Sequence, residues 1–256
     1  MSKKKTPRLP AVTPEGKQSQ RTRREEMAQL LVDRKRDERR RAIRIQAGIG
    51  ALVVALVVGI TVGVLSTGGE DEPAAVPAGL TESGAVRFGP DDAAVTVRAV
   101  EDFQCPACRQ FESALGATLA EYRASDDVAV EYVPIAFLDR ASTTEYASRA
   151  LNASMCVLAD AGADAWMAMH ESLYAQQPSE GGAGLDDRTL ASMAVDAGAD
   201  IDAVGPCITE RRYDDWVQEH TDEVMSSGVG STPTVFVNDE PTQPGDLVAA
   251  VDAARS

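Results

Sequence analysis

The sequence predicts an α/β fold that carries a helical insertion and follows one transmembrane helix. Three observations predict it. A strand, a helix and a second strand succeed one another over residues 94–138, an alanine-rich helical stretch follows to about residue 226, and an uncharged apolar run occupies residues 47–65. Because two strands joined by a crossover helix run parallel, the first observation indicates a sheet with at least one parallel pair.

The first 44 residues are polar and basic. They contain 15 Lys and Arg against 6 Asp and Glu, whereas the whole chain has a net charge of −15. A basic head and an acidic body are expected to face different surroundings. The acidic remainder argues against nucleic acid as a partner, because phosphate binding needs a positive face. Topology control and solvation are the expected roles of this arm, with binding to anionic lipid or nucleic acid as the alternative.

The apolar run at residues 47–65 has the length of a membrane span. At about 1.5 Å per residue, a helix of this length reaches roughly 28 Å, close to the roughly 30 Å of bilayer hydrocarbon. Arginines precede the run, and acidic residues follow it at 70–72. The positive-inside rule therefore predicts a cytoplasmic arm at 1–44, a transmembrane helix at 45–66, and an extracytoplasmic remainder. The alternative is a cleaved signal peptide, although its basic head is usually shorter.

An extracytoplasmic linker is expected at residues 67–82, which begin with a stretch rich in Gly, Pro, Glu and Ala. The folded domain is expected to occupy residues 83–256, which is long enough for one sizeable core. Runs rich in β-branched residues predict its first strands, and spacing at i, i+4 and i+8 predicts the helix between them. Strands are expected at 85–88, 94–100 and 128–138, and a helix at 109–125.

Alanine-rich composition predicts that the insertion, at about residues 141–226, is made of several helices. Glycines at 181, 182 and 184 separate them. Helices are expected at 143–159, 164–175, 187–197 and 202–226. The chain then returns to the sheet. A strand is expected at 234–237, a turn at 238–245 and a last helix at 246–254.

Cys105 and Cys108 stand at the predicted junction of a strand and a helix, with the spacing Cys-x-x-Cys. At the start of a helix, free N–H groups and the helix dipole stabilise a thiolate and lower its pKa. A second thiol one turn later can close a disulfide and release a mixed disulfide. Pro106, which precedes Ala107 in the central dipeptide, suits the first helical position. We therefore expect Cys105 to be the exposed, attacking thiol and Cys108 the shielded, resolving thiol.

Metal binding through the thiols and a purely structural disulfide are the alternatives at this pair. A zinc ribbon would need a second close pair of ligands, whereas Cys156 and Cys207 stand alone and both histidines are distant from any cysteine. We expect His170 to be packed or half exposed on a helix and His220 to lie on a solvated face. No metal and no organic cofactor are expected, because a disulfide can carry the two electrons itself.

Three motifs, in order, resemble the DsbA-like branch of the thioredoxin superfamily. The run at 100–108, VEDFQCPAC, is similar to the active-site run, and GSTPTVFVN at 230–238 resembles the loop whose proline is cis in thioredoxin folds. WMAMHESLYAQQ at 166–177 is similar to a helix of the inserted subdomain. The resemblance covers about residues 85–254. It implies a thioredoxin fold with an inserted helical subdomain, and disulfide exchange with exported proteins.

The resemblance also implies roles for particular residues. In the family, the residue before the cis-proline faces the active cysteine and helps to seat an extended substrate strand; here that residue is Thr232, before Pro233. Many relatives have a buried acid six residues before the first cysteine, a position that Ala99 occupies in this chain. Glu101 and Asp102 are the candidates to replace it, although we expect both to face solvent. The central dipeptide also lacks the histidine of the best-known oxidases.

Cys156 and Cys207 are expected to form a structural disulfide within the insertion. All four cysteines follow the apolar run, and an even number outside the cytoplasm favours disulfides. The resemblance to actinobacterial relatives with a second bridge implies the same pairing. Two buried free thiols are the alternative.

These features together predict a membrane-anchored, monomeric protein disulfide oxidoreductase. Its expected partners are exported proteins with free cysteines and a quinone-linked membrane protein that restores its disulfide. Outside the cytoplasm a dithiol stays reduced only if something supplies electrons, which favours oxidation of substrates. The alternatives are an extracytoplasmic reductase, for instance in cytochrome maturation, a thiol-based metal-binding protein, and a tethered interaction module with an inactive redox site.

Overall fold

The structure is a computed structural model that describes residues 74–255. The predicted arm at 1–44, the predicted transmembrane helix at 45–66 and the first part of the predicted linker lie outside these residues. Among residues 74–255, no helix is both long enough and apolar enough to cross a membrane. The membrane anchor therefore stays a prediction.

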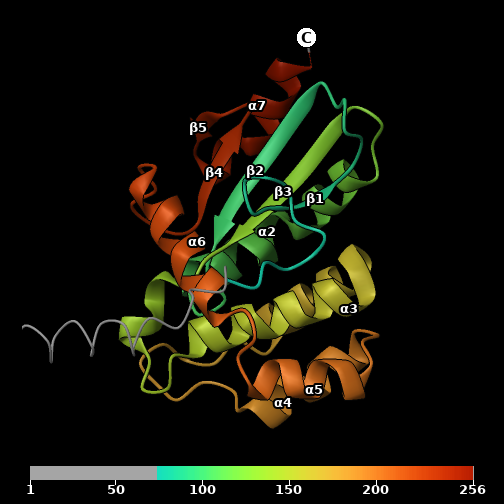
Figure 1. Ribbon diagram of the computed structural model, residues 1–256. Coiled ribbons are helices and arrows are strands. Elements are labelled where there is room, and N and C mark those ends of the chain that lie inside the picture. The colour runs from blue at the N-terminus through green and yellow to red at the C-terminus, as the bar shows by residue number, and fades with distance from the viewer. Residues whose placement is uncertain (1–73, 256) are drawn as a thin grey trace, which may run out of the picture. The chain divides into compact units, whose positions relative to one another are not determined.

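A five-stranded mixed sheet, in the order β1-β3-β2-β4-β5, forms the centre of the described residues (Figure 1). Strands β2 and β3 pair in parallel and are connected by the crossover helix α2 (Pro106–Arg123). The other neighbouring strands pair antiparallel. The α/β class is therefore confirmed. The strands are β1 (Val86–Phe88), β2 (Val95–Glu101), β3 (Val128–Pro134), β4 (Thr234–Val237) and β5 (Glu240–Thr242).

Both faces of the sheet are covered. Because successive residues of a strand point to opposite faces, Ala99 and Val100 of β2 join different cores. Ala99 lies in the larger core with Phe111 of α2 and Val251 of the last helix, α7 (Leu247–Ala254). Val100 lies in a smaller core, against which Val224 of helix α6 (Asp214–Ser226) packs. Helices α2 and α7 therefore cover one face of the sheet, and α6 covers part of the other.

Two predictions at the ends of strands differ from the structure. The third predicted strand stops at Pro134, and a 3-10 turn, η1 (Phe137–Ala141), follows. Proline has no N–H to donate to a ladder, so it favours the end of a strand or an edge position. The predicted turn at 238–245 contains a strand, β5, and a short 3-10 turn, η2 (Pro244–Asp246). Asn238 and Asp239, with φ of 49° and 67°, make the tight hairpin that turns β5 back onto β4.

The insertion between β3 and β4 is helical, which confirms the predicted helical insertion. Figure 1 shows α4 and α5 stacked on α3, on the side of α3 away from the sheet. Two predicted helices are joined in α3 across Gly162, whose φ of 82° makes a kink. One predicted helix is divided into α5 and α6, and Arg211, with φ of 51°, lies between them. The helices are α3 (Tyr146–Ala175), α4 (Asp187–Asp196), α5 (Ile201–Thr209) and α6 (Asp214–Ser226).

A disulfide between Cys156 of α3 and Cys207 of α5 links two helices of the insertion. Asn152, one turn before Cys156 in α3, also bonds to the chain at the end of α5 and the start of α6. Its side-chain nitrogen donates to the Cys207 carbonyl at 3.4 Å, and its side-chain oxygen accepts from the backbone N–H of Tyr213 at 2.9 Å. The disulfide and this amide together hold α3, α5 and the start of α6 at one place.

The prediction that His220 lies on a solvated face is wrong. His220 is 5 % exposed and stacks on Trp216, with 4.6 Å between the ring centroids. The two residues belong to the buried side of α6, which also includes Val217 and Thr221 at helical spacing. The charged neighbours in sequence point away from this side, so they gave a false indication. Burial lowers the pKa of His220 to about 4.

We expect His220→Phe to make the protein less sensitive to acid. In the folded state the pKa of His220 is about 4, whereas in the unfolded chain it is about 6.5. Neutral His220 therefore supports folding above pH 6.5, and this contribution is lost as the pH falls towards 4. The loss between pH 7 and pH 5 is about 2 kcal/mol. Urea unfolding of both proteins at the two pH values measures it. An equal pH dependence in parent and variant would contradict the assignment.

Candidate active site

Cys105 and Cys108 lie where β2 leads into α2. Cys105 is the N-cap residue of α2, with φ of −75° and ψ of 117°, and Pro106 begins the helix. Cys108 lies in the first turn, and its N–H donates to the Cys105 carbonyl at 3.1 Å. Both cysteines are free thiols in the structure. The geometry is the one that favours a thiolate at the first position, because unpaired N–H groups at a helix start face it.

Access to the two thiols differs, although less than the sequence suggested. Cys105 is 7 % exposed and Cys108 is fully buried. The prediction that Cys105 is exposed is therefore wrong, because the loop at Thr232 lies against it. The Cys105 thiol donates to the Thr232 carbonyl at 3.3 Å, across 127 positions of sequence. The peptide bond between Thr232 and Pro233 is cis, and β4 begins directly after it.

The two thiols have opposite acidities. A hydrogen bond from the Cys108 thiol, an interaction with Thr232 and the N–H groups of Cys108 and Ala107 lower the pKa of Cys105 from 9.0 to about 5, although burial opposes them. Burial raises the pKa of Cys108 far above its ordinary value, and the nearby Cys105 and Glu101 add to the rise. At neutral pH the pair therefore holds one thiolate, at Cys105, and one thiol, at Cys108.

We expect iodoacetamide to alkylate Cys105 of the reduced protein at pH 6 and to leave Cys108 unmodified. Because the pKa of Cys105 is about 5, its reaction rate should rise with a midpoint near pH 5, well below the roughly 8.5 of a free thiol. Mass spectrometry of peptides after timed labelling measures both rates. The same protein in denaturant is the control, in which both cysteines should react alike. Faster labelling of Cys108 would reverse the two roles.

Glu101 and Asp102 are both buried, so the prediction that they face solvent is wrong. Their exposed fractions are 2 % and 0 %. Asp102 accepts hydrogen bonds from the N–H groups of Gln104 at 2.7 Å and of Leu138 at 2.8 Å. It therefore ties the segment before Cys105 to the segment after β3. Burial raises its pKa to about 7. Acidic residues are rarely buried without partners, and here one partner, Gln104, is a near neighbour and the other, Leu138, comes from a distant part of the chain.

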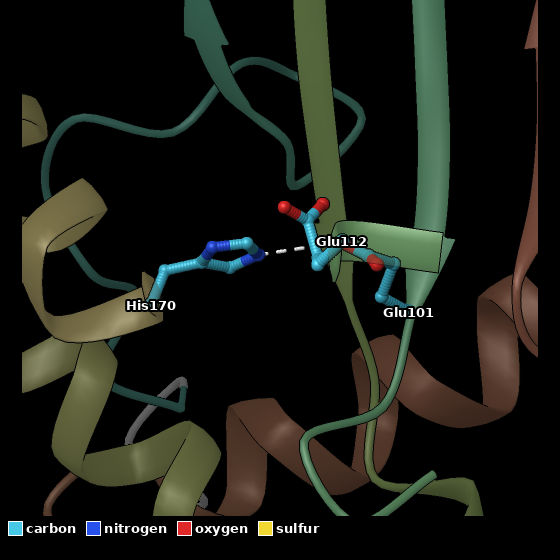
Figure 2. Close-up of side chains that lie close together, drawn as sticks. All are labelled: Glu101, Glu112 and His170. Atoms are coloured by element: carbon cyan, nitrogen blue, oxygen red, sulfur yellow. Dashed lines mark hydrogen bonds and ion pairs between the residues drawn. The ribbon is translucent and has the colours of Figure 1, made fainter. Parts of the chain in front are cut away.

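Glu101 belongs to a cluster that sequence reasoning missed. Figure 2 shows His170 of α3 pointing towards the carboxylates of Glu101 and Glu112, and His170 Nε2 lies 3.2 Å from Glu101 Oε2. Burial raises the pKa of Glu101, raises that of Glu112 to about 8 and lowers that of His170 to about 4. His170 is buried on a helix, as predicted, but nothing in its sequence neighbourhood indicated the two carboxylates. Ala99 stands where many relatives have a buried acid. That Glu101 or Asp102 takes over the role of that acid in this chain stays a prediction.

Gln177 is a second residue that sequence reasoning did not single out as functional. It follows α3 and is 8 % exposed. Its side-chain nitrogen donates to the carbonyls of Phe103 and Cys105, each at 2.9 Å. The helical insertion therefore holds the active-site segment directly through one amide. The position of Gln177 at the end of the motif at 166–177 was the signal available in the sequence.

An apolar hollow flanks the thiols between α2 and α7. Its volume is about 510 Å³, and its lining includes Ala107 and Phe111 of α2, Pro233, and Val248 of α7. The hollow thus begins at the active-site dipeptide and includes the cis-proline. An apolar chain segment that approached Cys105 would meet this surface.

Comparisons with known proteins agree with this geometry. The family described as Thioredoxin matches residues 81–253. The oxidised DsbA of Mycobacterium tuberculosis is 31 % identical, with a TM-score of 0.56, over 66 % of this chain and 92 % of that chain. The reduced disulfide bond oxidoreductase DsbG of the same organism is 30 % identical, with a TM-score of 0.57, over 67 % of this chain and 88 % of that chain.

A more distant structure and one curated protein complete the comparison. BdbD of Bacillus subtilis, 22 % identical with a TM-score of 0.60 over 72 % of this chain and 97 % of that chain, shows the fold alone. The Na(+)/H(+) antiporter NhaA 3 of Salinispora tropica is 32 % identical over 152 residues, which are 59 % of this chain and 21 % of that protein. The chain thus spans about a fifth of the length of this curated relative. Because the family match covers well over half of the sequence, this chain belongs to the thioredoxin family, as a DsbA-like protein whose structural neighbours are thiol-disulfide oxidoreductases.

Proposed function

We propose that this protein is a thiol-disulfide oxidoreductase that passes a disulfide from Cys105 and Cys108 to exported proteins with free cysteines. The observation that carries the proposal is the contrast between the two thiols. Cys105 has a pKa of about 5 at the start of a helix, and Cys108, one turn later, is buried with a raised pKa. A disulfide between them is reduced readily, because reduction yields a thiolate that the fold stabilises.

The proposed reaction has two exchange steps. A substrate thiolate attacks the Cys105 sulfur of the oxidised pair, the bond to Cys108 breaks, and Cys108 leaves with the electron pair and takes up a proton. A second substrate thiolate then attacks the substrate sulfur of the mixed disulfide, and Cys105 leaves as a thiolate. Low pKa makes Cys105 a good leaving group. The substrate loses two electrons, which the cysteine pair gains, so no organic cofactor takes part.

Thr232 and Pro233 are proposed to seat the substrate. The Thr232 carbonyl already lies 3.3 Å from the Cys105 sulfur, and Pro233 lines the apolar hollow beside it. An extended substrate segment that pairs with the backbone at this loop would bring its cysteine to Cys105 and its apolar side chains into the hollow. The pairing is a backbone interaction, so it would suit many sequences.

The proposed setting is extracytoplasmic. A single transmembrane helix at 45–66, with the N-terminus in the cytoplasm, would hold a monomeric domain at the outer surface of the cell membrane. A quinone-linked membrane protein would reoxidise the cysteine pair after each turnover. The second candidate function is reduction, for instance in cytochrome maturation. The missing histidine in the central dipeptide favours it, because one source of thiolate stabilisation is then absent.

The test of direction is the resting state of the cysteine pair. Cells that express the chain are quenched in acid and treated with a thiol reagent that adds mass, and the modified protein is resolved by electrophoresis. We expect Cys105 and Cys108 to be found mostly as a disulfide, because an oxidase rests oxidised. A Cys105→Ser, Cys108→Ser variant marks the position of the fully unmodified domain. A resting pair of free thiols would overturn the oxidase and would favour the reductase.

A further inference from the structure

We propose that Glu101, Glu112 and His170 bind a divalent transition-metal ion of the zinc type, beneath the cysteine pair and independently of its thiols. The three residues come from three elements, namely the end of β2, helix α2 and helix α3. One potential ligand atom from each lies within 4.8 Å of the other two. A modest movement of the side chains towards a common centre would therefore place each ligand atom at the roughly 2.0–2.2 Å from the ion that zinc needs for nitrogen and carboxylate ligands.

The donor atoms of this cluster have hydrogen-bonding capacity that the fold leaves unused. Among the described residues, Glu101 Oε1 and Glu112 Oε1 are buried atoms with no hydrogen-bond partner, and His170 Nε2 faces the cluster. Glu101 and His170 are 2 % and 1 % exposed. Buried polar atoms are nearly always paired, and buried carboxylates are paired with a charge or coordinate a metal. Buried carboxylate oxygens without a partner, close to an imidazole nitrogen, are what a cation site requires.

The charges of the cluster also suit a dication. Glu101 and Glu112 bring two carboxyl groups into one buried space, and each would lose its proton and bind the ion as a carboxylate. Two arginines, Arg109 and Arg123, line the neighbouring cavity; the Arg123 guanidinium is bonded to the Tyr132 hydroxyl at 2.5 Å and paired with Glu171 at 3.6 Å. One divalent ion would balance both carboxylates, and the imidazole of His170 would complete an electrically neutral set.

One side of the cluster borders a cavity. The cavity has a volume of about 440 Å³, and Glu112 is the member of the cluster that lines it, together with Glu171, Arg109 and Arg123. Aromatic rings enclose the cluster on the inner side, with Tyr132 and Trp166 at 4.9 and 5.0 Å from the His170 ring. The ion would therefore be open to water on one side only.

The ligand set selects the kind of ion. Three protein ligands and a water molecule make a common tetrahedral zinc site, and zinc accepts both imidazole and carboxylate. Calcium takes six to eight oxygen ligands and magnesium near-ideal octahedral oxygen ligation, which this cluster does not offer. The bound ion would link β2 and α2 of the thioredoxin core to α3 of the insertion, directly below the active site. Its expected effect is to stabilise that junction.

The test uses zinc chloride and the protein with Cys105 and Cys108 oxidised, so that no free thiol can bind. Calorimetric titration should show one saturable site, and zinc should raise the melting temperature followed by circular dichroism, since an ion that binds the folded state stabilises it. Cobalt(II) in place of zinc should give the visible absorption of a nitrogen and oxygen site, without a thiolate charge-transfer band. Absence of saturable binding to the oxidised protein would overturn the proposal.

Matched variants locate the site. Glu112→Gln keeps the size of a half-buried side chain and removes one ligand, so zinc affinity should fall by at least about 10-fold. Glu171→Gln is the control, because Glu171 lines the same cavity and is exposed but lies outside the cluster. The zinc affinity of the Glu171→Gln variant should equal that of the parent protein. His170→Phe tests a second ligand in case one variant folds poorly. Equal affinity in the Glu112→Gln and Glu171→Gln variants, or a cobalt spectrum with a thiolate band, would refute the assignment.

Discussion

Cys105→Ser should reduce disulfide exchange to the background rate, whereas Cys108→Ser should leave a protein that stops at the mixed disulfide. With a pKa of about 5, Cys105 is almost wholly thiolate at pH 7, about 30-fold more than a thiol with a pKa of 8.5. A serine hydroxyl provides no such nucleophile or leaving group, so the loss should be at least about 30-fold. The measurement is the oxidation rate of a reduced model peptide with two cysteines.

The Cys108→Ser variant distinguishes the two roles. For this variant the substrate is the disulfide form of the same peptide. The Cys105 thiolate attacks the peptide disulfide and one peptide sulfur leaves as a thiolate; without the Cys108 thiol nothing in the active site then releases the bound peptide, so a covalent adduct should accumulate on non-reducing gels. Ala107→Ser is a control for a change in the same loop and should turn over normally. If Cys105→Ser trapped the substrate and Cys108→Ser did not, the attacking thiol would be Cys108.

Loss of the disulfide in the insertion should have the largest effect on stability. We expect replacement of both Cys156 and Cys207 by serine to lower the free energy of unfolding by about 4 kcal/mol in the chain-entropy model, because the bond closes a loop of 51 positions. For a domain of this size, that corresponds to a fall in melting temperature of roughly 8–16 °C. Thermal unfolding followed by circular dichroism measures the difference.

The same variant should keep its exchange activity at a temperature where it is folded. Cys156 and Cys207 lie in α3 and α5, and α5 stacks on the side of α3 away from the sheet. Peptide mapping without reductant should find the two parent peptides linked. An unchanged melting temperature would show that the bond adds nothing to the folded state. Loss of exchange in folded protein would show that the insertion controls the active site through this bond.

The local pattern of the sequence was sufficient to predict those strands and helices whose formation depends on residues close to one another in the sequence. The strand at 94–100, the helix after Cys105 and the helical insertion are found close to their predicted places, because β-branched runs and helical spacing act within a few residues. The ends were less accurate. Predicted helices were joined across Gly162 and divided near Arg211, since packing against other helices decides whether a turn continues or breaks.

The redox pair is the part of the site that the sequence by itself determined. A Cys-x-x-Cys spacing at a helix start dictates which thiol faces the unpaired N–H groups, so most of the acidity of Cys105 follows from local geometry, and Thr232 adds to it from a distant loop. The environment around the pair was decided only by the tertiary structure. Glu101, Asp102 and His170 are flanked in sequence by residues that gave no indication of their partners, and sheet and helix packing buried all three. Burial and pairing depend on contacts between distant segments, which is why the thiols were predictable and the charged groups around them were not.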